Sequence, residues 1–229
     1  LLAQHGIGAP STATTASTVS HADIWFLLDR SGSMSAIAEH VVAGFDRFFH
    51  DQRAQPGTAT VTLVQFDGEA PHDVLVDARP IDAVRSMRGR FEPRGVTPLY
   101  DAIGMLLDRA ERLVGAGADP ADQLVVIFSD GLENASSDWT RERIDARIAA
   151  LRADGWTFVF LGANQDSYAT GRQMSMAPGS VSNFAFDDDG VAAAYHHLSA
   201  NVTAFRAKPR HRRRTDEADF WSEAGKPER

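Results

Sequence analysis

Two short, unbroken apolar runs, Ile24–Leu28 and Leu124–Phe128, constrain the fold of this 229-residue chain most strongly. An apolar run of this length without polar alternation is typical of a strand that is buried on both faces. Such strands occur mainly in parallel sheets that carry helices on both sides. The two runs therefore predict an α/β fold.

Strand-like and helix-like patterns alternate along the rest of the chain. Asp67-Gly68 separates two extended runs and predicts a hairpin with one antiparallel edge strand. The remaining alternation predicts a Rossmann-like, doubly wound, mostly parallel sheet with right-handed crossovers and helices on both faces. Further strands are expected at residues 60–66, 74–76, 156–161 and 180–184, and helices at 37–49, 99–114, 139–153, 165–174 and 191–205.

Composition favours a single domain with short appendages. A hydrophobic content of 43% over 229 residues suffices for one full core. We expect residues 1–21 to be a flexible leader rich in Ser, Thr and Ala, residues 22–206 to form the domain, and residues 207–229 to be a charged tail. The apolar runs fall far short of the roughly 20 residues of a membrane span, so no membrane partner is expected. The absence of cysteine excludes disulfides and thiolate metal sites, and it is compatible with the cytoplasmic location that we expect.

Charge is distributed unevenly along the chain. The formal net charge is −8, yet residues 206–229 hold 8 of the 23 Lys and Arg residues. An acidic body makes nucleic-acid binding an unlikely function, because non-specific affinity comes mainly from Lys and Arg that neutralise phosphates. The run Arg210–Arg214 is the exception. We interpret it as a solvated tail, and RNA or nucleotide binding through it stays open as an alternative function.

Oxygen-bearing side chains follow both apolar runs. Asp29, Ser31 and Ser33 come after the first run, and Asp130 comes after the second. Parallel strands end at one edge of a sheet, and ligands bind in the crevice beyond that edge. Thr97, in a loop between these segments, adds a third hydroxyl. An oxygen-only ligand set of this kind predicts a site for Mg²⁺, with Mn²⁺ or Ca²⁺ also possible.

Three segments carry a resemblance to a known family. Phe26–Met34, Gly95–Ala102 and Phe128–Asn134 resemble the metal-ion-dependent adhesion site of von Willebrand factor A domains, in particular the bacterial intracellular branch. The resemblance implies a six-stranded sheet with one antiparallel edge and a metal held by the five ligands named above. It also implies a protein partner that offers Asp or Glu to the metal, in a setting such as an AAA+ ATPase or a multiprotein assembly. It implies binding, and it does not imply catalysis.

Other residues near the motifs are weaker candidates. Ser31 or Ser33 is also expected to cap the helix that follows. The acidic and aromatic segment Thr215–Glu223 suggests self-association through the tail. The predicted rim of the partner-binding surface consists of Gly32, Met34, Gly131, Glu133, Asn134, Asn164 and Asp166.

An enzyme is the third hypothesis, after the binding module and the RNA-linked module. In a Mg²⁺-dependent phosphoesterase, Asp29 would be the nucleophile and Asp130 a metal ligand. The chain has no Walker-type Gly-Lys-Ser/Thr sequence, and the motif at Asp29 has no second Asp two residues on. We therefore expect a protein that is not an enzyme.

Overall fold

A computed structural model describes residues 20–114, 118–130, 132–163, 167–215 and 220–221. Residues 1–19 of the predicted leader and most of the segment Thr215–Glu223 lie outside these ranges. Six strands form one sheet: β1 His21–Asp29, β2 Thr58–Phe66, β3 Asp73–Pro80, β4 Gln123–Ser129, β5 Thr157–Gly162 and β6 Val181–Asn183. The α-helices are α1 Ala38–Arg53, α2 Leu99–Leu113, α3 Arg141–Asp154, α4 Ser167–Gln173, α5 Asp188–Ala207 and α6 Arg210–Thr215. Short 3-10 helices span Gly32–Ile37, Ile81–Ala83, Pro120–Asp122 and Pro178–Ser180.

The sheet has the strand order β3-β2-β1-β4-β5-β6, and β3 is its antiparallel edge strand. All other neighbouring strands pair in parallel. The predicted fold class, a mostly parallel six-stranded sheet with one antiparallel edge, is confirmed. Strand order reverses between β1 and β4, and in open α/β sheets the crevice at this switch point is where ligands bind.

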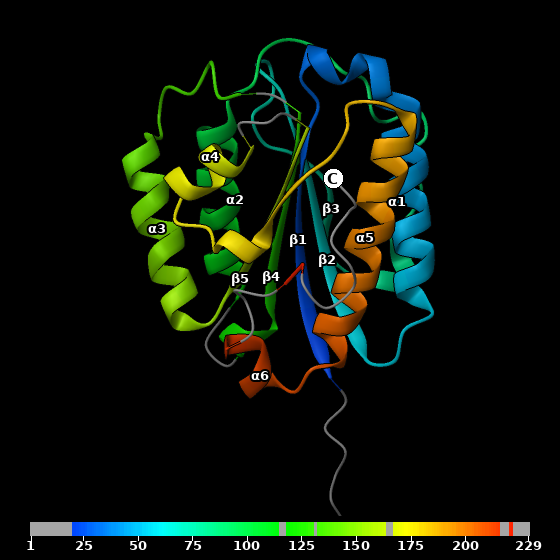
Figure 1. The fold of residues 1–229 in the computed structure, drawn as a ribbon, viewed down its shortest axis with the longest axis vertical. Helices are drawn as coiled ribbons and strands as arrows, with labels where there is room; N and C mark the ends of the chain where they lie inside the picture. The colour runs from blue at the N-terminus through cyan, green and yellow to red at the C-terminus, as the bar shows by residue number, and fades with distance from the viewer. Residues whose placement is uncertain (1–19, 115–117, 131, 164–166, 216–219, 222–229) are drawn as a thin grey trace, which may run out of the picture.

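Helices cover both faces of the sheet (Figure 1). Side chains alternate along β1, so Ile24, Phe26 and Leu28 pack under α1 and α5, whereas Trp25 and Leu27 face α2 and α3. A strand that is buried on both faces needs apolar side chains at every position, which explains why Ile24–Leu28 is an unbroken apolar run. Within the described ranges, no helix has both the length and the apolarity that crossing a membrane requires.

The helix α5 begins at Asp188, three residues before the first apolar residue from which we predicted it. Asp187 precedes it, and the Asp187 carboxylate accepts a hydrogen bond from the Gly190 amide at 2.7 Å. A carboxylate at this position satisfies a free amide of the first turn. The apolar pattern therefore marked the buried part of the helix, and the capping residue set its true start.

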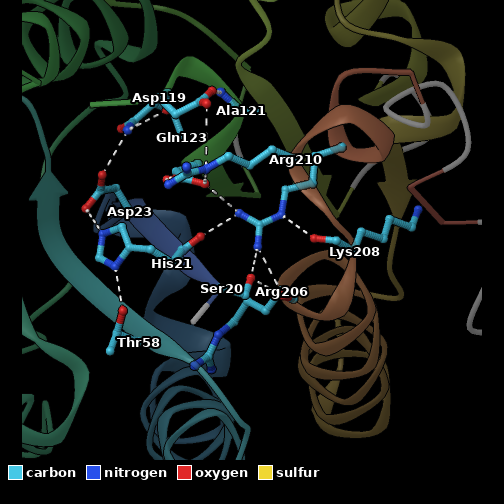
Figure 2. Close-up of polar contacts among 12 residues, drawn as sticks. Ser20, His21, Asp23, Thr58, Asp119, Ala121, Gln123, Arg206, Lys208 and Arg210 are labelled. Carbon is cyan, nitrogen blue, oxygen red and sulfur yellow. Dashed lines mark hydrogen bonds and ion pairs between the residues drawn. The ribbon is translucent and has the colours of Figure 1, made fainter. Parts of the chain in front are cut away.

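The interpretation of Arg210–Arg214 as a solvated tail is wrong for Arg213, which is buried, although the other four residues of the run are exposed. These residues belong to α6, which packs at the end of the sheet where β1 begins. The Arg213 side chain is buried and donates to Asp122 at 3.0 Å and to the His21 carbonyl at 2.5 Å. Arg210 also pairs with Asp122 at 2.5 Å. Figure 2 labels residues around this cluster, among them Ser20, His21 and Arg210. Sequence reasoning missed the cluster because the partner carboxylate lies about 90 residues away in the chain.

Candidate metal centre

The site is built around Asp29, the last residue of β1, whose side chain is fully buried. One Asp29 oxygen, Oδ1, accepts a hydrogen bond from the Ser31 amide at 2.7 Å. The other, Oδ2, accepts one from the Ser129 hydroxyl at 2.5 Å. The parallel pairing of Leu28 with Phe128 brings Ser129 beside Asp29, so the register of β1 and β4 positions this carboxylate.

A chain of hydroxyls connects the two strand ends. The Ser31 and Ser33 hydroxyl oxygens are 3.1 Å apart, and Ser33 Oγ donates to Asp130 Oδ1 at 2.9 Å. Ser31 lies at the N-terminus of the 3-10 helix Gly32–Ile37, but its side chain makes no capping hydrogen bond. The expected cap is therefore not formed by Ser31, and its hydroxyl faces the site instead.

Thr97 is buried in a loop that backbone hydrogen bonds hold against both strand ends. The Gly32 amide donates to the Gly95 carbonyl at 3.1 Å. On the other side, the Thr97 amide donates to Asn134 Oδ1 at 2.9 Å, and the Asn134 amide donates to the Thr97 carbonyl at 3.2 Å. The structure thus brings together the three segments that carry the predicted ligands.

Glycines at this junction have separate roles. A Cβ on Gly32 would approach the Gly95 carbonyl oxygen to 3.2 Å, so close approach of two backbones, rather than a positive φ, accounts for Gly32. Gly95 has a φ of 65°, in the left-handed region that favours glycine. Together they let the loop that carries Thr97 lie directly against the segment after β1.

Burial raises the pKa of Asp29 to about 6, against the opposing effect of hydrogen bonds from Ser129 and Ser31. The negative charge of Asp130 raises it further. Burial also raises the pKa of Asp130, although the bond from Ser33 lowers it. Two carboxylates that lose hydration beside each other are unfavourable without a compensating cation.

This donor set fits a hard divalent cation. Its atoms are carboxylate and hydroxyl oxygens, which Mg²⁺ and Mn²⁺ prefer, and desolvated carboxylates favour a positive charge. Across the described ranges, no group of three or more His, Asp or Glu side chains is placed to hold a metal. The neutral hydroxyls of Ser31, Ser33 and Thr97 would therefore have to complete the set that Asp29 and Asp130 begin.

The predicted rim is only partly accessible. Met34 is fully buried in the core between the sheet and α1, so its assignment to the rim is wrong. Glu133 is half-buried, and its carboxylate accepts bonds from the amides of Tyr100 and Ala135 at 2.9 and 2.8 Å. Asn134 is exposed, and its side-chain oxygen accepts a hydrogen bond from the Thr97 amide. Gly131, Asn164 and Asp166 lie outside the described residues.

Two residues of the site were not predicted as functional. Ser129 binds Asp29 directly, and it could have been found because it precedes Asp130 at the end of the same strand. Asp67 follows β2 and lies on the same edge of the sheet, but its role depends on two arginines distant in sequence. Local pattern gives no signal for such a contact.

Comparisons with known proteins agree with this architecture. A family model described as von Willebrand factor type A domain matches residues 23–197. No curated protein matches the sequence. Among solved structures, the manganese-loaded TRAP protein of Plasmodium vivax is similar, with a TM-score of 0.57 and 15% identity over 83% of this chain and 75% of that chain.

Two further structures show the same fold at low identity. The pilus adhesin SpaC of Lactobacillus rhamnosus GG has a TM-score of 0.61 and 14% identity, with coverage of 81% of this chain and 31% of that one. A von Willebrand factor type A protein from Catenulispora acidiphila has a TM-score of 0.55 and 16% identity, with coverage of 80% and 43%. This chain therefore spans less than half of these two proteins.

Proposed function

The chain belongs to the von Willebrand factor type A family, and we propose that it is a divalent-metal-dependent module that binds an acidic side chain of a protein partner. Domains of this family generally mediate protein–protein interactions. The observation that carries the proposal is the continuous set of oxygen atoms from Asp29 through Ser31 and Ser33 to Asp130. The similar TRAP structure is manganese-loaded, which supports the proposal that this chain also takes a divalent metal.

Asp29, Ser31, Ser33, Thr97 and Asp130 would hold the cation, with Mg²⁺ as the first choice and Mn²⁺ or Ca²⁺ as alternatives. When bound, a cation balanced by two carboxylates supplies an electrophilic position for an external carboxylate oxygen. Asp29 acts as a ligand rather than a nucleophile in this proposal, and hydrogen bonds from the Ser31 amide and the Ser129 hydroxyl hold its carboxylate in place. The hydroxyls of Ser31 and Ser33 hold the strand ends together without adding charge.

The partner is a protein that presents Asp or Glu, and an AAA+ ATPase or a multiprotein assembly is the setting we propose. RNA binding through the basic run is disfavoured, because Arg210 and Arg214 pair with Asp122 and Asp119 and Arg213 is buried. The cytoplasmic location, the bacterial intracellular branch and the absence of catalysis stay predictions.

Thermal unfolding of EDTA-treated protein tests the metal site. Mg²⁺ or Mn²⁺ should raise the melting temperature, because a ligand that binds only the native state stabilises it by about 2.7 kcal/mol at 100 times its Kd. Ser33→Ala should weaken this response, since Ser33 Oγ contacts both Ser31 and Asp130. Ser35→Ala is the matched control, because Ser35 is also exposed but donates its hydroxyl to the Gly32 carbonyl instead. Equal responses of the two variants would contradict the proposed ligand set.

The acidic-partner proposal needs a separate test. Once a partner is identified, its binding should require the cation and should be lost when one Asp or Glu of the partner is changed to the amide. Binding that persists in EDTA would show that this protein recognises its partner through another surface.

A further inference from the structure

Asp67 is a fully buried carboxylate immediately after β2, and the proposed metal site does not use it as a ligand. Its Oδ1 accepts hydrogen bonds from the amides of Glu69 and Ala70 at 2.7 and 2.9 Å. Its Oδ2 accepts from Arg30 Nε at 2.7 Å and from Arg94 Nε at 3.1 Å. One oxygen thus fixes the local turn, and the other joins two arginines.

The two arginines belong to the two segments that carry predicted ligands. Arg30 stands between Asp29 and Ser31, and Arg94 is three residues before Thr97. The Arg94 amide also donates to the Arg30 carbonyl at 2.9 Å, so the segments already touch through their backbones. Asp67 adds a side-chain connection at the point where they meet.

Besides joining the two segments, the Asp67 carboxylate carries a negative charge that attracts both arginines. Arg30 and Arg94 bring two positive charges into the segments that carry the predicted ligands, and each guanidinium group is held by carboxylates: Arg30 by Asp67 and Asp73, and Arg94 by Asp67 and Glu69. Burial alone would raise the pKa of Asp67, but hydrogen bonds from Ala70, Glu69, Arg30 and Arg94 together lower it. The carboxylate therefore stays ionised at neutral pH and holds both guanidinium groups by charge-assisted bonds.

We propose that Asp67 is a positioning residue for the metal site, which locks the segment Asp29–Ser33 to the segment Arg94–Thr97 by holding the side chains of both arginines. This inference rests on the proposed function, because it assigns Asp67 a role toward that metal. Residues that orient metal ligands typically change metal affinity by about 10- to 100-fold when they are replaced.

Asp67→Asn isolates this role. The amide keeps an oxygen that can accept from Glu69 and Ala70, but it places an NH₂ group against two guanidinium donors. We expect Mn²⁺ and Mg²⁺ to bind the folded variant about tenfold or more weakly in a calorimetric titration well below its melting temperature. We also expect faster hydrogen exchange at residues 30–33 and 94–97.

Asp122→Asn is the matched control. Asp122 is also buried and also bonds two arginines, Arg210 and Arg213, but at the opposite end of the sheet. Its substitution should lower the melting temperature while leaving cation affinity and exchange at residues 30–33 and 94–97 unchanged. A purely structural role of Asp67 would make the two variants behave alike.

The outcomes separate this inference from the proposed function. Wild-type cation affinity in folded Asp67→Asn would overturn the inference and leave the metal site standing. Wild-type protein that binds no cation would overturn the proposed function, and hydrogen exchange would then still decide whether Asp67 joins the two segments. If hydrogen exchange at residues 30–33 and 94–97 were the same in Asp67→Asn as in the wild type, Asp67 would not join the two segments.

Discussion

Burial of the Asp29 side chain disfavours the charged form of its carboxylate. In the metal-free protein, its pKa rises from 3.8 to about 6, chiefly through burial. Between about pH 4 and 6 the folded protein therefore binds a proton that the unfolded chain has lost, so stability falls as pH rises through this window. The residue thus lowers the stability of the metal-free protein at neutral pH, and a bound cation would remove this penalty.

Asp29→Asn should therefore stabilise the metal-free protein at pH 7, by at most about 3 kcal/mol, and flatten its pH dependence between pH 4 and 6. The amide can preserve both contacts, because its oxygen accepts from Ser31 and its NH₂ donates to Ser129. The same change should abolish stabilisation by Mg²⁺ or Mn²⁺. Urea unfolding in EDTA at pH 4.5 and pH 7.5, repeated with the cation, measures both effects.

A variant that is less stable than wild type in EDTA at pH 7.5 would contradict this account of Asp29. It would mean that the two hydrogen bonds of the carboxylate outweigh its desolvation.

At the scale of elements, α1 and α5 can pack closely because α1 has a glycine, Gly44, where it meets α5. A Cβ on Gly44 of α1 would lie 2.2 Å from the Tyr195 ring of α5. Tyr195 in turn stacks on Phe128 of β4 with ring centroids 5.0 Å apart and on Phe26 of β1 at 6.5 Å. The strands that end at the candidate metal site are therefore packed under this helix pair, and the missing Cβ sets how closely the pair can lie.

Gly44→Ala should destabilise the protein by about 1–3 kcal/mol, because overpacking outweighs the roughly 1 kcal/mol that Ala gains over Gly in a helix. Urea unfolding measures the difference. In a Tyr195→Leu background the smaller side chain leaves room for the methyl group, so the same change should become neutral or stabilising. A destabilisation of equal size in both backgrounds would show that the Tyr195 ring is not the obstacle.

At the scale of the whole molecule, α6 joins three elements at one end of the sheet. Arg213 donates to the carbonyls of His21, Arg206 and Lys208, to the Ser20 hydroxyl and to Asp122, so one buried guanidinium joins the start of β1, the end of α5 and the start of β4. Its guanidinium carbon also lies 4.7 Å from the centre of the Phe205 ring. The basic run thus belongs structurally to the domain.

Arg213→Met should lower the free energy of unfolding by about 3–5 kcal/mol, because it leaves Asp122 without one of its buried partners and strips three carbonyls of a donor. Arg212→Met, at an exposed position of the same helix, should lower it by less than about 1 kcal/mol, because the interactions of an exposed guanidinium group contribute little. Urea unfolding of both variants measures the difference. Equal effects would show that α6 does not stabilise the domain through Arg213.

Local sequence determined most of the elements, with α6 as an exception, and the principal residues of the candidate site. Unbroken apolar runs revealed buried strands because each residue there contacts apolar neighbours on one of two faces. Asp29, Ser31, Ser33 and Asp130 were recognisable because they follow such strands, and parallel strands end at one edge. These inferences need only residues that are neighbours in the chain, together with a rule about sheets.

Only the tertiary structure decided which distant groups meet. Asp67 lies 37 residues from Arg30, and Arg213 lies 192 residues from the His21 carbonyl that it binds. Met34 looked like a rim residue by its position in the motif, yet the 3-10 helix turns it into the core. Strand order, register and helix packing set these contacts, and a buried charge has no local pattern because its partner can come from any part of the chain.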